Sequence, residues 1–148
     1  MAGTTPYILF AILTGIAVAV QTGVNTELRS KIGSPLAAAL VSFLVGTVLL
    51  TAMIALTRAP VPVRRLASLP WWLWTGGALG AFIVGTNIVA APRLGAALLM
   101  SLAIAGQLAA SLVLDHFGAF NFPVHPISFG RIAGGLMLVG GVVLIRYA

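Results

Sequence analysis

The sequence predicts an all-α membrane protein with five transmembrane helices in each protomer. Of its 148 residues, 60% are hydrophobic and only 7% are charged, and the mean hydropathy is +1.12, far from the composition of a soluble domain. Apolar stretches about 20 residues long occur five times, which is the length at which a helix crosses a hydrocarbon core roughly 30 Å thick. A chain of this size is expected to form a single transmembrane domain over residues 1–148.

Five apolar segments, separated by charges and helix-breaking residues, define the predicted spans. The predicted boundaries are residues 7–28, 35–56, 71–91, 94–114 and 127–145. The first span lacks the basic leading region of a cleavable signal peptide, so we expect it to be retained.

Proline, glycine and charge mark the joints between the spans. Glu27, Arg29 and Lys31 follow the first span and lead into a Gly33-Ser34-Pro35 turn. The second joint is proline-rich, and its residues 63–69 could form a short interfacial helix with two arginines toward the headgroups.

The later joints carry an aromatic interface marker, a two-residue turn and a longer loop. Three tryptophans within residues 71–74 mark a membrane interface at the start of the third span. Only Pro92-Arg93 separates the third and fourth spans, which predicts a tight antiparallel hairpin. Residues 115–126 contain Asp115, His116 and Gly118 and are predicted to be a loop.

The Lys and Arg residues divide almost evenly between the two sides of the membrane that the joints define. One side has Arg58, Arg64 and Arg65, with Arg131 as a fourth if its side chain snorkels there, and the other side has Arg29, Lys31, Arg93 and Arg146. Orientation follows the Lys/Arg excess in short loops, so 3 or 4 against 4 predicts that either orientation inserts. An inverted copy would then supply the second half of an inverted repeat. The alternative is a bias hidden by the span boundaries, or a partner subunit that fixes the orientation.

Several functional classes are disfavoured. The net charge of +6 comes from scattered single residues rather than a basic stripe, which argues against nucleic acid. There is no cysteine, no metal-ligand cluster, no Ser-His-Asp set and no glycine-rich strand-to-helix loop. We therefore expect neither an enzyme nor a bound cofactor.

Polar residues inside the spans are candidates for substrate binding, because an unpaired amide in hydrocarbon costs several kcal/mol. Gln21 lies one helical turn before Asn25, on the same face of the first span. The predicted substrate-binding set is Gln21, Asn25, Ser42, Ser101 and Gln107. Gln21 lies roughly 5 Å past the middle of its span toward one face of the membrane, and Gln107 lies roughly 5 Å past the middle of its span toward the other face. Inverting one copy therefore brings the two residues to the same depth. The alternative is that these amides tie helices together, at about 1 kcal/mol for each bond.

Two ionisable residues near the membrane have two interpretations each. Glu27 is expected to pair with Lys31 one turn later, or it could exchange a proton for a cationic substrate in a wet vestibule. Arg131, about one turn into the last span, is expected to snorkel to the interface, the alternative being substrate binding.

Short strings along nearly the whole chain resemble the YdcZ-like family of five-span bacterial inner-membrane proteins. The matching strings are Gln21-Thr-Gly-Val-Asn25, Gly33-Ser-Pro35, Ser42-Phe43-Leu-Val-Gly46-Thr47, Trp71-Trp72, Gly76-Gly77-Ala-Leu-Gly80, Ala91-Pro-Arg-Leu-Gly95, Gly106-Gln107 and Asp115-His-Phe-Gly118. The family belongs to the drug/metabolite transporter superfamily, so the resemblance implies an antiparallel ten-helix dimer in the inner membrane. Unlike the small multidrug exporters of that superfamily, this chain has no acidic residue in the middle of its first span, which argues against simple proton/drug antiport.

These observations together predict a dual-topology transporter that moves a small molecule by alternating access. Its expected partners are the lipid bilayer, its substrate, and a second copy or an oppositely oriented paralogue. The alternatives are a passive small-ion channel built as an inverted dimer and a non-transporting assembly subunit.

Overall fold

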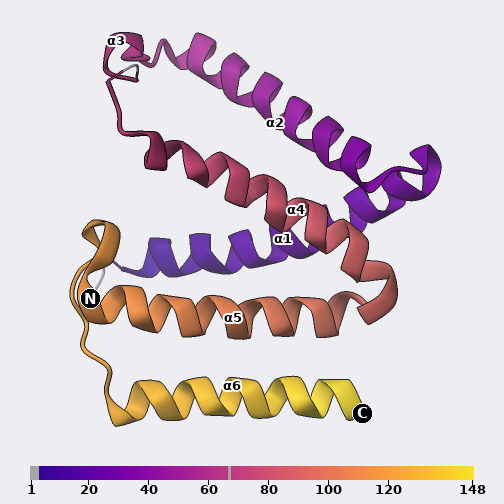
Figure 1. The fold of residues 1–148 in the computed structure, drawn as a ribbon, viewed down its shortest axis with the longest axis vertical. Coiled ribbons are helices and arrows are strands. Elements are labelled where there is room, and N and C mark those ends of the chain that lie inside the picture. The colour runs from indigo at the N-terminus through magenta and orange to yellow at the C-terminus, as the bar shows by residue number, and fades with distance from the viewer. Residues whose placement is uncertain (1–3, 67) are drawn as a thin grey trace. The chain divides into compact units, whose positions relative to one another are not determined.

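A computed structural model of the chain describes residues 4–66 and 68–148, and every regular element in that part is a helix (Figure 1). The elements are α1 (Thr5–Ile32), α2 (Pro35–Thr57), α3 (Val63–Leu66), the 3₁₀ helix η1 (Trp71–Trp74), α4 (Thr75–Leu94), α5 (Ala96–Phe117), the 3₁₀ helix η2 (Ala119–Asn121) and α6 (Phe129–Tyr147). Among the described residues, five helices are long and apolar enough to cross a membrane, with η1 and α4 counted together. The predicted all-α class and the five candidate spans are confirmed, and the antiparallel dimer stays a prediction.

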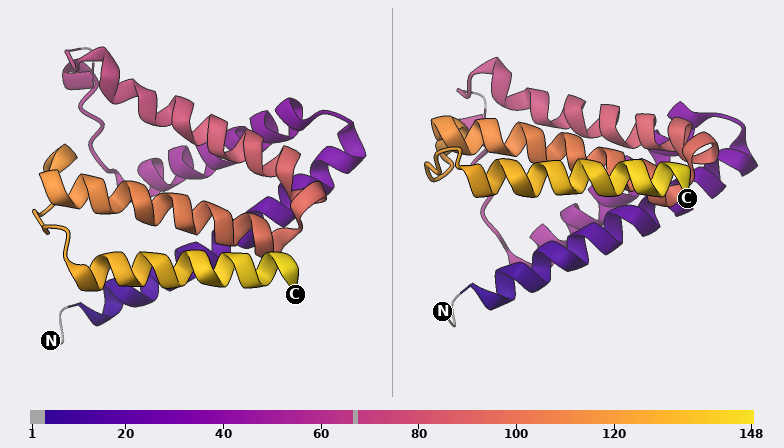
Figure 2. Two further views of the ribbon diagram at one scale, coloured as in Figure 1. Left: turned by 60° about the horizontal axis from the view of Figure 1, so that its bottom comes forward. Right: turned by 90° about the horizontal axis from the view of Figure 1, so that it is seen from below.

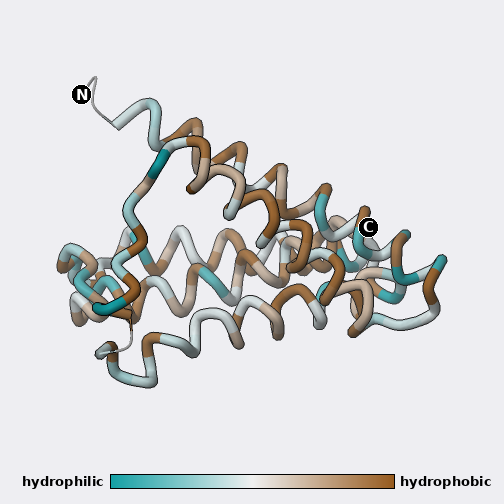
Figure 3. Tube along the Cα trace, turned by 90° about the horizontal axis from the view of Figure 1, so that it is seen from above, coloured by the Kyte–Doolittle hydropathy of each residue, from teal (hydrophilic) through white to brown (hydrophobic). Residues whose placement is uncertain are grey.

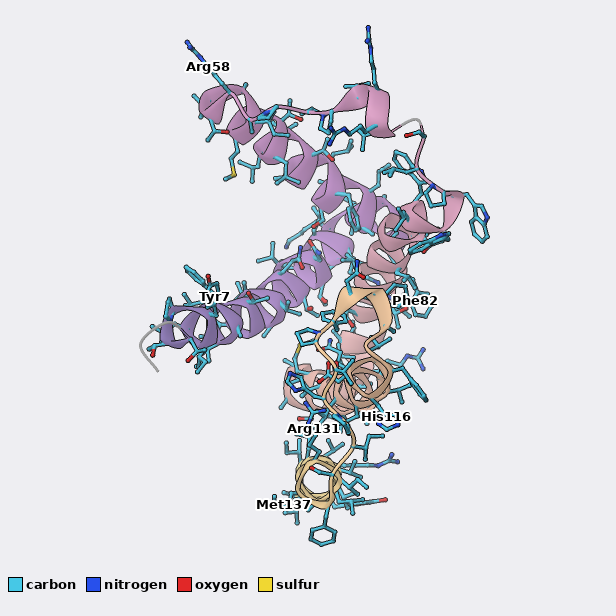
Figure 4. The ribbon with its side chains drawn as sticks, turned by 90° about the vertical axis from the view of Figure 1, so that its left-hand side faces the viewer. Tyr7, Arg58, Phe82, His116, Arg131 and Met137 are labelled. Atoms are coloured by element: carbon cyan, nitrogen blue, oxygen red, sulfur yellow. The ribbon has the colours of Figure 1, made fainter. Side chains whose placement is uncertain are left out.

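The surface of these helices is suited to lipid. Large apolar side chains are widely exposed, for example Phe82 on α4 and Met137 on α6, which are labelled in Figure 4. Figure 3 shows hydrophobic residues along the helices and hydrophilic residues gathered toward their ends. A soluble protein would not leave so much apolar surface in water, so the hydrocarbon of a bilayer must cover it.

The chain divides into two compact units, Met1–Arg93 and Leu94–Ala148. The prediction of one transmembrane domain over residues 1–148 concerns their assembly in the bilayer and stays a prediction.

In the first unit, a tight turn joins α1 to α2 as the sequence predicts. Gly33 takes a left-handed conformation (φ 73°), and its N–H donates to the Arg29 carbonyl over 2.8 Å. Ser34 then caps α2 by accepting from the Ala37 N–H at 3.2 Å, and Pro35 occupies the first helical position. Because the helix stops only at this glycine, α1 ends one turn later than residue 28, and its last charged residues lie inside the helix.

From this turn, α1 and α2 diverge, so that Tyr7 near the start of α1 and Arg58 at the end of α2 lie far apart (Figure 4). Near the turn the helices pack closely with α4. The buried residues there are Ala38, Ala39 and Ile88, with Leu28 and Val84 against them. Small alanines allow close helix approach in lipid, where van der Waals packing drives association.

The joint after α2 contains α3, a single helical turn over Val63–Leu66. A helix is thus confirmed over the first part of the predicted range 63–69, and its position at the membrane interface stays a prediction. Residue 67 lies outside the described residues, and Ser68 and Leu69 are not helical.

The end of α4 differs from the prediction. Pro92 and Arg93 lie inside the helix, which continues to Leu94, and the break falls at Gly95 (φ 75°). Pro92 is tolerated because it lies in the last turn, and because the Ile88 carbonyl, which lacks the usual N–H partner at position 92, accepts from Arg29 Nη1 at 3.2 Å. The antiparallel hairpin of the third and fourth spans stays a prediction.

The second unit is an antiparallel hairpin of α5 and α6, which lie side by side in both views of Figure 2. Both helices begin and end about two or three residues later than the predicted spans 94–114 and 127–145. α5 ends at Gly118 (φ 59°), where a Cβ would approach Val124 Cγ2 to 2.7 Å. Glycine is therefore required here both by the backbone conformation and by the close contact.

Candidate functional site

A cavity of about 250 Å³ lies in the first unit, between α1, α2 and α4. Its lining residues are Gln21 from α1, Ser42, Phe43, Gly46, Thr47 and Leu50 from α2, and Val84 from α4. We call it the Gln21 cavity. The α2 residues at 43, 46, 47 and 50 lie on one helix face, but α2 is apolar on all sides, so its sequence alone does not single out this face.

Two of the predicted binding residues, Gln21 and Ser42, share this cavity. Within the described part of the chain, neither side chain forms a hydrogen bond. The Thr47 hydroxyl donates to the Phe43 carbonyl at 2.8 Å, so it offers only its lone pairs to another molecule. The cavity therefore presents an amide and a hydroxyl that are free to bind.

Two glycines shape the space around these groups. The Phe43 ring lies over Gly80 of α4, where a Cβ would be 3.6 Å from the ring. A Cβ on Gly46 would meet nothing within 4 Å. The missing side chain at Gly46 thus keeps part of the Gln21 cavity empty.

Asn25, the third predicted binding residue, is buried, with 4% of its surface exposed, and is not among the residues that line the Gln21 cavity. Its neighbour Thr22 is also buried, and the Asn87 amide nitrogen lies 3.5 Å from the Thr22 hydroxyl oxygen, a long hydrogen bond between α4 and α1. Thr22 of α1 thus contacts α4, another helix of the first unit. A role for Asn25 in substrate binding stays a prediction.

The other two predicted residues lie on α5, in the second unit. Ser101 is partly buried, and its hydroxyl donates to the Ala97 carbonyl at 2.7 Å. Gln107 is exposed near the middle of α5. A site that combines them with Gln21 stays a prediction.

A second cavity, of about 480 Å³, lies at the C-terminal end of α1. Glu27 and Arg29 are among its lining residues. The Glu27 carboxylate pairs with Lys31 Nζ at 3.2 Å, which confirms the predicted pair one helical turn apart, and both side chains are largely exposed. A coupling role for Glu27 stays a prediction.

An ion pair closes the loop of the second unit. Arg131 Nη2 lies 2.8 Å from Asp115 Oδ2, and Nη1 donates to the His125 carbonyl at 2.9 Å. The arginine thus extends toward the joint, as snorkelling predicts, but it has a specific acidic partner that sequence reasoning missed. The signal was the lone aspartate at the opposite end of the same loop.

Backbone contacts complete this loop. The His125 N–H donates to the Asp115 carbonyl at 2.8 Å, and the Ile127 N–H donates to His116 Nδ1 at 3.2 Å. Figure 4 shows His116 and Arg131 at this end of the unit. In the described chain, no three metal-ligating side chains of the His, Cys, Asp or Glu type gather at one place.

Comparison with known proteins supports the resemblance. Residues 6–144 match the family model described as "Putative inner membrane exporter, YdcZ". The inner membrane protein YdcZ of Escherichia coli (strain K12) is 35% identical over 80 residues, which cover 54% of this chain and 53% of that protein. The match therefore spans about half the length of that relative, and no solved structure matches the chain.

The family match covers nearly the whole chain, and the five apolar helices fit it. A family of membrane exporters also favours a role other than catalysis. The chain belongs to the YdcZ family of inner membrane proteins and is a multi-pass protein of the bacterial inner membrane.

Proposed function

We propose that the protein exports a small molecule by alternating access, as a dual-topology chain that forms an antiparallel homodimer. The observation that carries this proposal is the Gln21 cavity, in which an amide and a hydroxyl without partners lie within helices surrounded by lipid. Polar groups at that depth are costly unless they bind something, and transporters place their substrate sites near the bilayer midplane. A passing solute would supply the missing hydrogen bonds.

The charge distribution supports insertion in both orientations. Since Arg131 reaches toward the joint between α5 and α6, it counts with Arg58, Arg64 and Arg65 on one side. The other side has Arg29, Lys31, Arg93 and Arg146, so the division is 4 against 4. The bonded Asp115 does not alter this balance, because acidic residues contribute little to orientation.

The depths of the two glutamines support a shared site less closely than the predicted spans implied. With the observed helix bounds, Gln21 lies about 4 Å past the midpoint of α1 and Gln107 only about 1 Å past that of α5. In an inverted pair, Gln107 of one copy would lie within about 3 Å of the depth of Gln21 of the other. A glutamine side chain can span that difference. The five predicted residues would then contribute to one site at the dimer interface.

Flux measurements on reconstituted protein test the proposal. We expect saturable flux of at least one solute among cations, polar metabolites and anions, and we expect Gln21→Leu or Gln107→Leu to reduce it about tenfold while dimers still cross-link. Thr14→Val, which changes an exposed hydroxyl of α1 outside the cavity, is the control. Loss of dimers together with flux would mean that the glutamines only tie helices together. Conduction without saturation would indicate a channel, and no flux at all an assembly subunit.

Topology can be tested separately, because the chain has no cysteine of its own. Arg65→Cys and Arg146→Cys place single labelling sites on opposite sides of each inserted chain. Dual topology predicts that an impermeant thiol reagent applied to cells labels part of the population at each position. Labelling of one position only, with the other fully protected, would show a single orientation.

A further inference from the structure

We infer that the Gln21 cavity binds small uncharged solutes that donate and accept hydrogen bonds, and not ions. This inference rests on the proposed function, since it names the class of solute that the exporter would carry. It is drawn from the charges, the free hydrogen-bonding groups and the size of the cavity.

Charge is absent from the cavity wall. None of its described lining residues is ionisable, and the nearest charges on α1, Glu27 and Arg29, lie roughly 9 Å and 12 Å farther along the helix axis than Gln21. An ion in hydrocarbon requires an opposite charge or a water-filled path. The Phe43 ring could attract a cation, but this attraction is weak compared with the cost of desolvating it.

The two acidic residues and the basic residue nearest to the cavity along α1 are already engaged. Both acidic residues of the chain are paired, Glu27 with Lys31 at 3.2 Å and Asp115 with Arg131 at 2.8 Å. Arg29, the basic residue nearest to the cavity along α1, donates to the Ile88 carbonyl. A cation entering the Gln21 cavity would thus have to break an existing ion pair to reach a carboxylate, and an anion would have to displace Arg29 from the Ile88 carbonyl to pair with it.

The free groups match an uncharged polar solute. The Gln21 carboxamide and the Ser42 hydroxyl can each donate and accept, whereas the Thr47 hydroxyl already donates to its own helix and can only accept. Phe43, Leu50 and Val84 offer apolar contact to a carbon skeleton. At about 30 Å³ for each water-sized group, 250 Å³ holds roughly eight such groups, the size of a short polyol or a small amide.

The test compares matched probes on purified protein and on proteoliposomes. The uncharged probes are threitol and acetamide. The charged probes are threonate, the carboxylate counterpart of threitol, and choline, a cation of similar size. Binding is measured as ligand-dependent stabilisation in detergent, and transport as flux of the labelled probe. We expect stabilisation and flux with an uncharged probe, and neither with threonate or choline.

Variants assign the effect to this cavity. Gly46→Leu adds a side chain where a Cβ meets nothing within 4 Å, so it should fill the space and weaken binding of the uncharged probe at least about tenfold. Ala52→Leu places the same side chain at an exposed position of α2 outside the cavity and should leave binding unchanged. Gln21→Glu should weaken the uncharged probe and create choline binding, a gain that a misfolded variant would not show.

The outcomes separate the inference from the proposed function. If threonate or choline crosses the membrane and Gly46→Leu blocks this flux, the inference is wrong, but the proposed export function is still supported. Binding of an uncharged probe without flux would support the inference and count against the exporter. If no uncharged probe binds or crosses, or if Gly46→Leu leaves binding intact, the inference is wrong.

Discussion

The polar side chains of the Gln21 cavity in the first unit and those of the loop in the second unit differ in whether they form hydrogen bonds within the chain. In Met1–Arg93, the helices α1 and α2 diverge around a cavity in which Gln21 and Ser42 form no hydrogen bonds within the described chain. In Leu94–Ala148, the charged and polar groups of the loop bind one another and close the α5–α6 hairpin. The cavity of the first unit therefore leaves two polar groups without partners, whereas the polar groups of the second unit's loop satisfy one another.

Gly118→Ala should give the largest difference in stability between the two units. Alanine at φ 59° costs roughly 1–2 kcal/mol, and its Cβ would also displace Val124, so we expect a loss of about 2 kcal/mol in the second unit. All three tryptophans lie at 71, 72 and 74, in the first unit, so their fluorescence reports on that unit alone. Thermal unfolding should shift more by circular dichroism than by fluorescence.

The control for this experiment is Gly106→Ala on α5, where a Cβ meets nothing within 4 Å. It should stabilise slightly, by about 0.5–1 kcal/mol. Equal shifts in both signals for Gly118→Ala would show that the two units unfold together, and the comparison between them would then lose its energetic basis.

A double-mutant cycle tests the contact that replaces a helix hydrogen bond in the first unit. Arg29→Leu removes the donor to the Ile88 carbonyl and should cost about 1.5–3 kcal/mol, the usual range for a charged hydrogen bond. In a Pro92→Ala background the backbone N–H returns, so the same substitution should cost less than about half as much. Chemical unfolding followed by tryptophan fluorescence measures both. An equal cost in both backgrounds would mean that Arg29 does not substitute for the missing N–H.

The ion pair of the second unit should have a smaller effect, because Asp115 and Arg131 are about a quarter to a third exposed. Asp115→Asn is expected to cost about 1 kcal/mol, near the upper end for exposed pairs. Circular dichroism in detergent measures the loss. Exchanging the two residues, with Asp115→Arg and Arg131→Asp together, should recover part of it. A double variant less stable than either single variant would contradict the pairing.

Glu27→Gln is expected to have the smallest effect. The pair with Lys31 is largely exposed, so its loss should change stability by less than about 0.5 kcal/mol and flux by less than about twofold. Flux with and without a pH gradient provides the measurement. Loss of gradient-driven flux alone would identify Glu27 as a coupling residue and would place part of the mechanism in the second cavity, at the C-terminal end of α1.

Much of the fold could be predicted because it depends on local features. The turn at Gly33-Ser34-Pro35 and the pair Glu27–Lys31 are set by neighbours within one helical turn. The end of α4 could not be placed in this way. Proline normally stops a helix, and its tolerance here depends on Arg29, 63 positions before Pro92 in the sequence.

The same distinction applies to the candidate site. Polarity within an apolar span selected Gln21, Ser42 and Asn25 alike, and the sequence could not show that the first two line one cavity whereas Asn25 is buried outside it. Residues that shape the cavity by their apolar surface or small size, such as Gly46 and Val84, give no chemical signal in the sequence. Their role follows from which helix faces meet.

The sequence by itself determined the solvent of this protein, the number of its spans and the local ends of most helices, because hydropathy and capping act over one span or one turn. Only the tertiary structure decided which polar groups are paired and which remain free to bind. Asp115 bonds to Arg131, and Arg29 replaces the donor that Pro92 lacks, whereas Gln21 and Ser42 face a cavity together. Hydrogen bonds between distant segments depend on packing geometry that hydropathy does not encode.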